Sequence, residues 1–214
     1  MKKIALCVLK SGGPDYHAGH VEALRDSFRR YSDRQLVCFS DVPVPVTRIP
    51  LRENWPGWWS KLEMFQPPES PEHFGFSFLY FDLDTVFVDD PEPLWRTTPG
   101  FTMLQRVRHP HDVGSGIMSW IGDYRRVYGR FSESPSAFIR EYRTTPKWGD
   151  QGFIRDTIGR EKIDTFPLSL AASYKGHCTN FGAKAFSIPD PDCRVVYFHG
   201  KPRPWQVPPV FKCR

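Results

Sequence analysis

The sequence predicts an α/β domain in which helices flank a central mixed, mostly parallel sheet. Two observations lead to this prediction. Short apolar runs alternate with amphipathic stretches through the first hundred residues, and that order is typical of a parallel sheet. The length of 214 residues suits a single domain, and no internal repeat or linker divides it.

The first half is expected to contain four strands and two helices. The apolar run IALCVL precedes a glycine turn, Lys10-Ser11-Gly12-Gly13, which favours a buried strand. Further on, Val21, Leu24 and Phe28 recur at helical spacing. The strands are predicted at residues 4–9, 36–39, 46–51 and 76–81, and the helices at residues 16–31 and 57–65.

The second half is expected to be less regular. Its strands are predicted at residues 101–104, 116–121 and 194–198, and its helices at residues 123–128, 136–142 and 150–158. Proline-rich stretches at residues 42–50, 66–73 and 202–209 indicate loops. All of residues 1–214 are therefore predicted to form one domain, of which about the first 100 residues have a nucleotide-binding pattern.

Composition limits the class of protein. A content of 40% hydrophobic and 15% aromatic residues excludes a disordered chain. No apolar run reaches the ~18 residues of a membrane span, and the turn after residue 9 does not resemble a signal-peptide cleavage site. Five cysteines without a CxxC pair indicate reduced thiols in a cytoplasmic protein. The net charge of +5 fits either an ordinary basic surface or a polyanionic partner such as nucleic acid.

Two carboxylates stand at the end of an apolar run, in the stretch LYFDLDTVFVDD. In an extended segment Asp82 and Asp84 would point to the same side, at the carboxyl end of a buried strand. Ligands of open α/β sheets bind at that end, and paired oxygen ligands suit Mg²⁺ or Mn²⁺. The alternative interpretation is a strand-end cap followed by a solvated turn.

Four segments resemble the motifs of a known enzyme family, in the family's order. YFDLDTVFV resembles the DxD motif of GT-A-fold glycosyltransferases, and VGSGIMSW at 113–120 resembles the NSG-type segment of glycosyltransferase family 8. WGDQGFI at 148–154 resembles the family's DQ segment, and YFHGKPRPW at 197–205 its late histidine motif. The resemblance implies a single GT-A (Rossmann-like) domain and a retaining enzyme that uses nucleotide-sugars, often UDP-sugars, with Mn²⁺ or Mg²⁺. The compact chain looks like small bacterial and phage-type relatives, which implies the cytoplasm of a bacterium or of a phage-infected host.

The resemblance also implies roles for individual residues. The second part of the chain, about residues 101–214, would be the acceptor half, and it would end in a tail that binds metal and phosphate. The metal ligands would be Asp82, Asp84 and His199, and Asp150 and Gln151 would face the anomeric carbon. The residues expected to bind the nucleotide-sugar are Leu9, Ser11, Gly12, Asp41, Lys61, Asp82, Ser115, Gly116 and Lys201.

Three departures from the family pattern are visible. Gly114 stands where the family often has Asn, the tail HGKPRPW is more closely spaced, and the chain is short. The predicted activity is glycosyl transfer to the hydroxyl of a saccharide, a lipid or a modified DNA base. The alternatives are a phage-type transferase acting on 5-hydroxymethylpyrimidine in DNA, and a non-catalytic nucleotide-sugar-binding protein. An inverting enzyme would need a base, for which Asp150 or Asp112 could serve.

Overall fold

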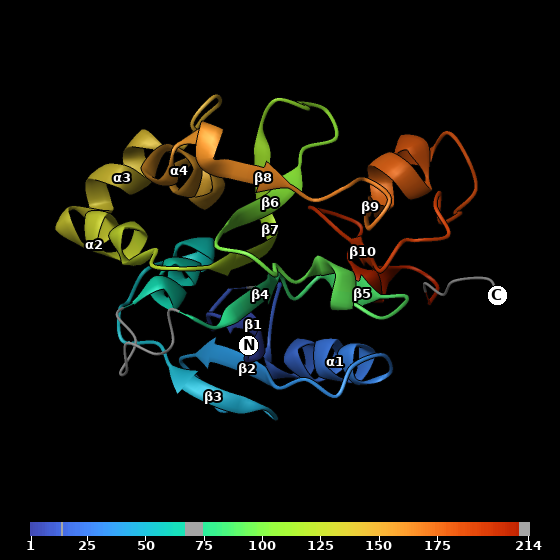
Figure 1. Cartoon of the computed structure of the whole chain (residues 1–214), viewed down its shortest axis with the longest axis horizontal. Coiled ribbons are helices and arrows are strands. Elements are labelled where there is room, and N and C mark those ends of the chain that lie inside the picture. Colours follow the sequence, from blue (N-terminus) through green and yellow to red (C-terminus); the bar gives the residue numbers. More distant parts are fainter. Residues whose placement is uncertain (14, 67–74, 210–214) are drawn as a thin grey trace.

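The fold is built around one seven-stranded sheet (Figure 1). A computed structural model describes residues 1–13, 15–66 and 75–209 of the chain. The strand order is β3-β2-β1-β4-β7-β6-β8, in which β7 alone runs antiparallel to its neighbours. The strands of this sheet are β1 (Lys3–Leu9), β2 (Leu36–Ser40), β3 (Thr47–Pro50), β4 (Ser77–Phe81), β6 (Gly100–Gln105), β7 (Val113–Ile121) and β8 (Ile163–Thr165).

A second, three-stranded sheet lies beside the carboxyl end of β4. Its order is β5-β10-β9, and its strands are β5 (Thr85–Phe87), β9 (Ala171–Ser173) and β10 (Val195–Tyr197). Because only three residues separate the end of β4 from the start of β5, the segment between them joins the two sheets. The double aspartate occupies this junction.

Helices cover both faces of the main sheet (Figure 1). On one face α1 packs through Val21, Leu24 and Phe28, the spacing that predicted it. On the other face the ring of Trp59 stacks on Phe131 with 4.9 Å between centroids. The longer helices are α1 (Ala18–Arg29), the 3₁₀ helix η1 (Gly57–Phe65), α2 (Arg125–Glu133), α3 (Pro135–Glu141), α4 (Gly149–Ile158) and the π-helical η5 (Tyr174–Cys178).

The predicted fold class is confirmed, including a mixed, mostly parallel sheet. All the predicted strands and helices are present, with ends that shift by a few residues, and residues 57–65 form a 3₁₀ helix. The sequence did not predict β5, β8 and β9, because three-residue strands are too short to show an alternating pattern. Most of the stretch 66–73, as well as Cys213, lies outside the described residues.

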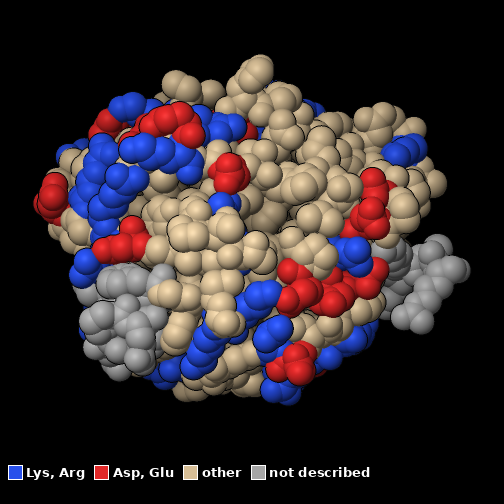
Figure 2. Space-filling model, in the orientation of Figure 1, with Lys and Arg blue, Asp and Glu red and all other residues tan. Residues whose placement is uncertain are grey.

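Positively and negatively charged side chains are mixed on the surface (Figure 2). Figure 2 shows blue and red patches interleaved on one face, with a blue patch at the upper left, over α2 and α3. Helix α2 carries Arg125, Arg126 and Arg130. Within the described ranges, none of the helices is long and apolar enough to cross a membrane.

Candidate active site

The site begins at the carboxyl end of β4, the middle strand of the main sheet. The amide of Asp82 donates to the carbonyl of Gly116 on β7 at 2.8 Å, and the amide of Thr85 donates back to Asp82 at 3.1 Å. The chain therefore turns at the two acids, whereas the sequence predicted that they lie in an extended segment. Asp82 and Asp84 consequently have different partners, although they remain close enough to interact.

Asp82 belongs to a buried cluster around Lys61. Lys61, on η1, places its Nζ 3.0 Å from Oδ1 of Asp82 and 3.1 Å from Oδ2 of Asp150 on α4. The hydroxyl of Ser115 on β7 donates to the same Asp150 oxygen at 2.6 Å. Burial alone would lower the pKa of Lys61, but the charges of Asp150 and Asp82 outweigh it and raise the pKa. Lys61 is therefore a permanent cation that joins three elements.

Asp84 belongs to a second cluster, on the α1 side. Its Oδ2 accepts from the hydroxyl of Tyr16 at 2.9 Å and forms an ion pair with Arg203 in the tail. Arg203 also lies 3.4 Å from Asp15, and its guanidinium is 4.9 Å from the centre of the Tyr16 ring. Burial first, and then the charge of Asp82, raise the pKa of Asp84 to about 6. The guanidinium acts against this rise by stabilising the carboxylate.

His199 follows β10 and lies among cations. Its Nε2 is 3.0 Å from the hydroxyl of Ser173 on β9. Partial burial of the ring, and then the charges of Lys175 and Arg108, lower the pKa of His199 to about 4. The imidazole is therefore neutral at pH 7.

The arrangement of Asp82, Asp84 and His199 does not fit a divalent metal ion. Nowhere in the described parts of the chain do three or more His, Cys, Asp or Glu side chains converge in a way that could hold one. Arg203 already pairs with Asp84, and His199 is engaged with Ser173. At Asp84, the place expected for the metal is thus taken by Arg203, a cation of the chain itself, because the tail folds back onto the double aspartate.

The expected nucleotide end of the site is formed by β1 and β2. Ser11 donates to Asp41 through both its amide, at 2.8 Å, and its hydroxyl, at 2.9 Å, and Lys10 also pairs with Asp41. Burial would raise the pKa of Asp41, but these donors lower it below its usual value. The backbone at Gly12 has a φ of +87° and open space where a side chain would be. The Leu9 side chain is in the core, so only its backbone can approach a ligand.

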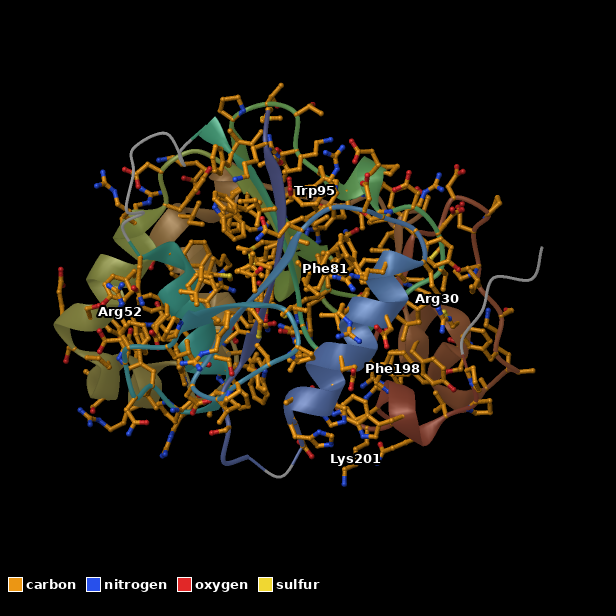
Figure 3. The ribbon with its side chains drawn as sticks, turned by 90° about the horizontal axis from the view of Figure 1, so that it is seen from below. Arg30, Arg52, Phe81, Trp95, Phe198 and Lys201 are labelled. Atoms are coloured by element: carbon orange, nitrogen blue, oxygen red, sulfur yellow. The ribbon has the colours of Figure 1, made fainter. Side chains whose placement is uncertain are left out.

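The remaining predicted residues border the Lys61 cluster or the tail. A Cβ added to Gly116 would lie 3.3 Å from Oδ2 of Asp82, so glycine permits this close approach. The side-chain oxygen of Gln151 lies 3.9 Å from the place of a Cβ on Gly114. Lys201 is exposed, and Figure 3 shows it pointing outward at the edge of the molecule.

The structure thus distributes the predicted residues among the Lys61 cluster, the Asp84 cluster, the surroundings of His199 and the Asp41 end of the site, and it adds residues that the sequence did not single out. The added side chains are Tyr16, Tyr80 and Arg203; the hydroxyl of Tyr80 donates to Asp82. Arg203 could have been singled out from the sequence, since it lies in the HGKPRPW motif. No sequence pattern indicates Tyr16, because only the folded chain brings the start of α1 to Asp84.

Comparisons with known proteins identify solved structures that share the fold of this chain. No family model matches the chain, and no curated protein matches it in sequence. Among solved structures, the galactosyltransferase LgtC in complex with donor and acceptor sugar analogues is 11% identical, with a TM-score of 0.64 over 94% of this chain and 89% of that one. The glycosyltransferase GlyE of Streptococcus pneumoniae is 11% identical, with a TM-score of 0.71 over 98% of this chain and 58% of that one.

The chain has the fold of these glycosyltransferases. Mouse xyloside xylosyltransferase 1 shares it too, at 10% identity and a TM-score of 0.55 over 94% of this chain and 98% of that one. The predicted GT-A-like α/β architecture is therefore confirmed. Membership of family 8 stays a prediction, because identities near 11% support the fold alone.

Proposed function

We propose that the chain is a glycosyltransferase that moves a sugar from a nucleotide-sugar, specifically a UDP-sugar, to an acceptor hydroxyl. The observation that carries the proposal is the buried Lys61 bridge between Asp82 and Asp150. It lies at the carboxyl end of the middle strand, where open α/β sheets bind their ligands. The glycosyltransferase fold around it supports the same assignment.

The donor is proposed to lie along the line from β1 to β7. Asp41 and the open turn at Gly12 would receive the nucleotide, and Asp82, whose side chain is 35% exposed, would face the ribose. Ser115 and Gly116 would border the sugar. These positions follow the order in which the described side chains lie along the sheet edge.

We further propose that transfer proceeds with retention of configuration. The bond from the anomeric carbon to the diphosphate breaks, the acceptor oxygen forms a new bond on the same face, and its proton moves to the departing phosphate oxygen. Asp150 and Gln151 would stabilise the positively charged sugar. Oδ2 of Asp150 already accepts from Ser115 and pairs with Lys61, which suits a fixed charge better than a mobile base.

The test is release of UDP from a panel of UDP-sugars, measured in buffers containing either Mn²⁺ or EDTA. We expect the wild-type chain to release UDP in the presence of saccharide acceptors. Asp150→Asn should lower the rate by about 100-fold, since it removes a charge aimed at the reacting carbon. Asp123→Asn, on the surface before α2, is the matched control and should keep the wild-type rate. Binding of UDP-sugars without any turnover would instead identify a non-catalytic binding protein.

A modified DNA base as the acceptor is the second candidate. The net charge of +5 and the arginines of α2 favour it, because duplex DNA binds to basic surfaces (Figure 2). DNA containing 5-hydroxymethylcytosine should then accept the sugar, with a rate that falls steeply as salt increases. Transfer to saccharides only, with little dependence on salt, would reject this candidate.

A further inference from the structure

We propose that fixed cations of the chain, namely Arg108, Lys175 and Arg203, bind the diphosphate of the donor and that no divalent metal takes part. This inference rests on the proposed function, because it concerns how the same donor is held. It follows because Asp84 and His199, two of the expected metal ligands, are in contact with other side chains, Arg203 and Ser173.

Three separate segments bring these cations together. The segment after β6 packs on η5, since a Cβ on Gly176 would meet the Val107 side chain at 2.7 Å. The Nζ of Lys175 lies 3.4 Å from the place of a Cβ on Gly200, so η5 also contacts the tail. Arg108 is held in place by Phe181, 4.1 Å below its guanidinium. The cluster therefore depends on tertiary packing rather than on one flexible loop.

Arg203 is paired with Asp84 and Asp15, but the charges of Arg108 and Lys175 are not balanced by acids in the part of the chain that the structure describes. Within residues 1–13, 15–66 and 75–209, neither Arg108 nor Lys175 forms an ion pair with an acid. Burial, followed by the charges of Arg108 and Arg203, lowers the pKa of Lys175. Cations crowded in this way repel one another, and an anion between them would remove the repulsion. A diphosphate has the charge and the oxygens to do so.

Arg203 takes the place that a metal would need at the double aspartate. Its guanidinium pairs with Oδ2 of Asp84 and stacks over Tyr16, whose hydroxyl donates to the same oxygen. A divalent ion at Asp84 would have to displace this guanidinium. It would also enter a region that holds the positive charges of Lys175 and Arg108, so it would be repelled.

The first experiment measures the binding of UDP by calorimetry in EDTA and in MnCl₂. We expect the wild type to bind UDP with equal affinity in the two buffers. The affinity for UDP should fall by about tenfold in Arg108→Gln and in Lys175→Gln, because each variant loses a charge-assisted hydrogen bond to the diphosphate. Uridine, which lacks phosphates, should bind both variants as it binds the wild type. Arg29→Gln, at the exposed end of α1, is the matched control and should leave the affinity for UDP unchanged.

The second experiment measures Mn²⁺ binding directly by electron paramagnetic resonance. Wild-type protein should bind Mn²⁺ weakly, and Arg203→Gln should bind it about tenfold more tightly, because Asp84 is then released from its partner. In EDTA the same variant should bind UDP more weakly. Circular dichroism confirms that each variant is folded.

The outcomes separate this inference from the proposed function. Binding of UDP only with Mn²⁺, or equal Mn²⁺ affinities of the wild type and Arg203→Gln, would overturn the inference and leave the glycosyltransferase proposal standing. Failure to bind UDP in either buffer would overturn both.

Discussion

Lys61 is the residue on which the geometry of the site depends most directly. Its side chain is 5% exposed and it holds two carboxylates that come from different elements. A buried charge network of this kind is a weak source of net stability, because removing charges from water costs about as much as their attraction returns. Breaking it is costly, however, because the remaining charges are then buried without a partner.

Replacing Lys61 with Met should therefore destabilise the protein strongly. We expect the free energy of unfolding to fall by roughly 3–5 kcal/mol, since Asp82 and Asp150 lose their shared cation. Urea unfolding followed by circular dichroism measures this change. Lys147→Met removes an exposed pair with Glu141 and should cost less than about 1 kcal/mol. Similar losses in the two variants would show that Lys61 is not a buried bridge.

At the scale of elements, the start of α4 decides where Asp150 and Gln151 lie. A Cβ on Gly152 would be 1.9 Å from the carbonyl oxygen of Lys147, so the preceding loop passes directly against the helix. Gly149, at the first helical position, has a φ of +62°, a conformation that glycine adopts readily. These two glycines allow the loop to turn sharply into α4.

Gly152→Ala should disturb both stability and activity. The added methyl group forces the loop and the helix apart, which we expect to cost at least about 1–3 kcal/mol and to displace Asp150 from Lys61. Thermal unfolding and UDP release measure the two effects. Gly129→Ala is the control, because a Cβ there meets nothing within 4 Å and alanine favours the α2 helix. A Gly152→Ala protein as stable as the control would contradict this account of the loop.

At the scale of the whole molecule, the tail closes one side of the site by returning to the first helix. Trp205 stacks on His20 with 3.8 Å between ring centroids and meets Tyr16 edge-on at 5.8 Å. The same tail carries Arg203 to Asp84 and to Asp15, which is 188 positions earlier in the chain. Aromatic contacts therefore help to hold a cation at the double aspartate.

Loss of this aromatic contact should loosen the tail. We expect Trp205→Ala to weaken UDP binding several-fold while the main sheet keeps its melting temperature, because pairs of this kind contribute about 0.5–1.5 kcal/mol. A double-mutant cycle with His20→Ala measures the coupling by calorimetry. Strictly additive effects of the two substitutions would show that the stacking does not position the tail.

Much of this molecule could be predicted from the sequence because the responsible signals are local. Apolar periodicity identified α1, β1, β2 and β4, and the switch from an apolar run to Asp82 and Asp84 marked the edge of the sheet where the site lies. The resemblance to glycosyltransferase motifs implied that Lys61, Ser115 and Asp150 belong to one site, and the structure does bring these three together.

Only the tertiary structure decided what those side chains contact. Asp84 and Arg203 are 119 positions apart, and no pattern in the sequence indicates that the guanidinium would take the expected place of a metal. The three-residue strands β5 and β9 are likewise too short to be recognised along the chain, yet their pairing with β10 carries His199 and the tail to the site. The physical reason is that periodicity reports which face of an element is buried, whereas ion pairs between distant segments depend on how whole elements pack.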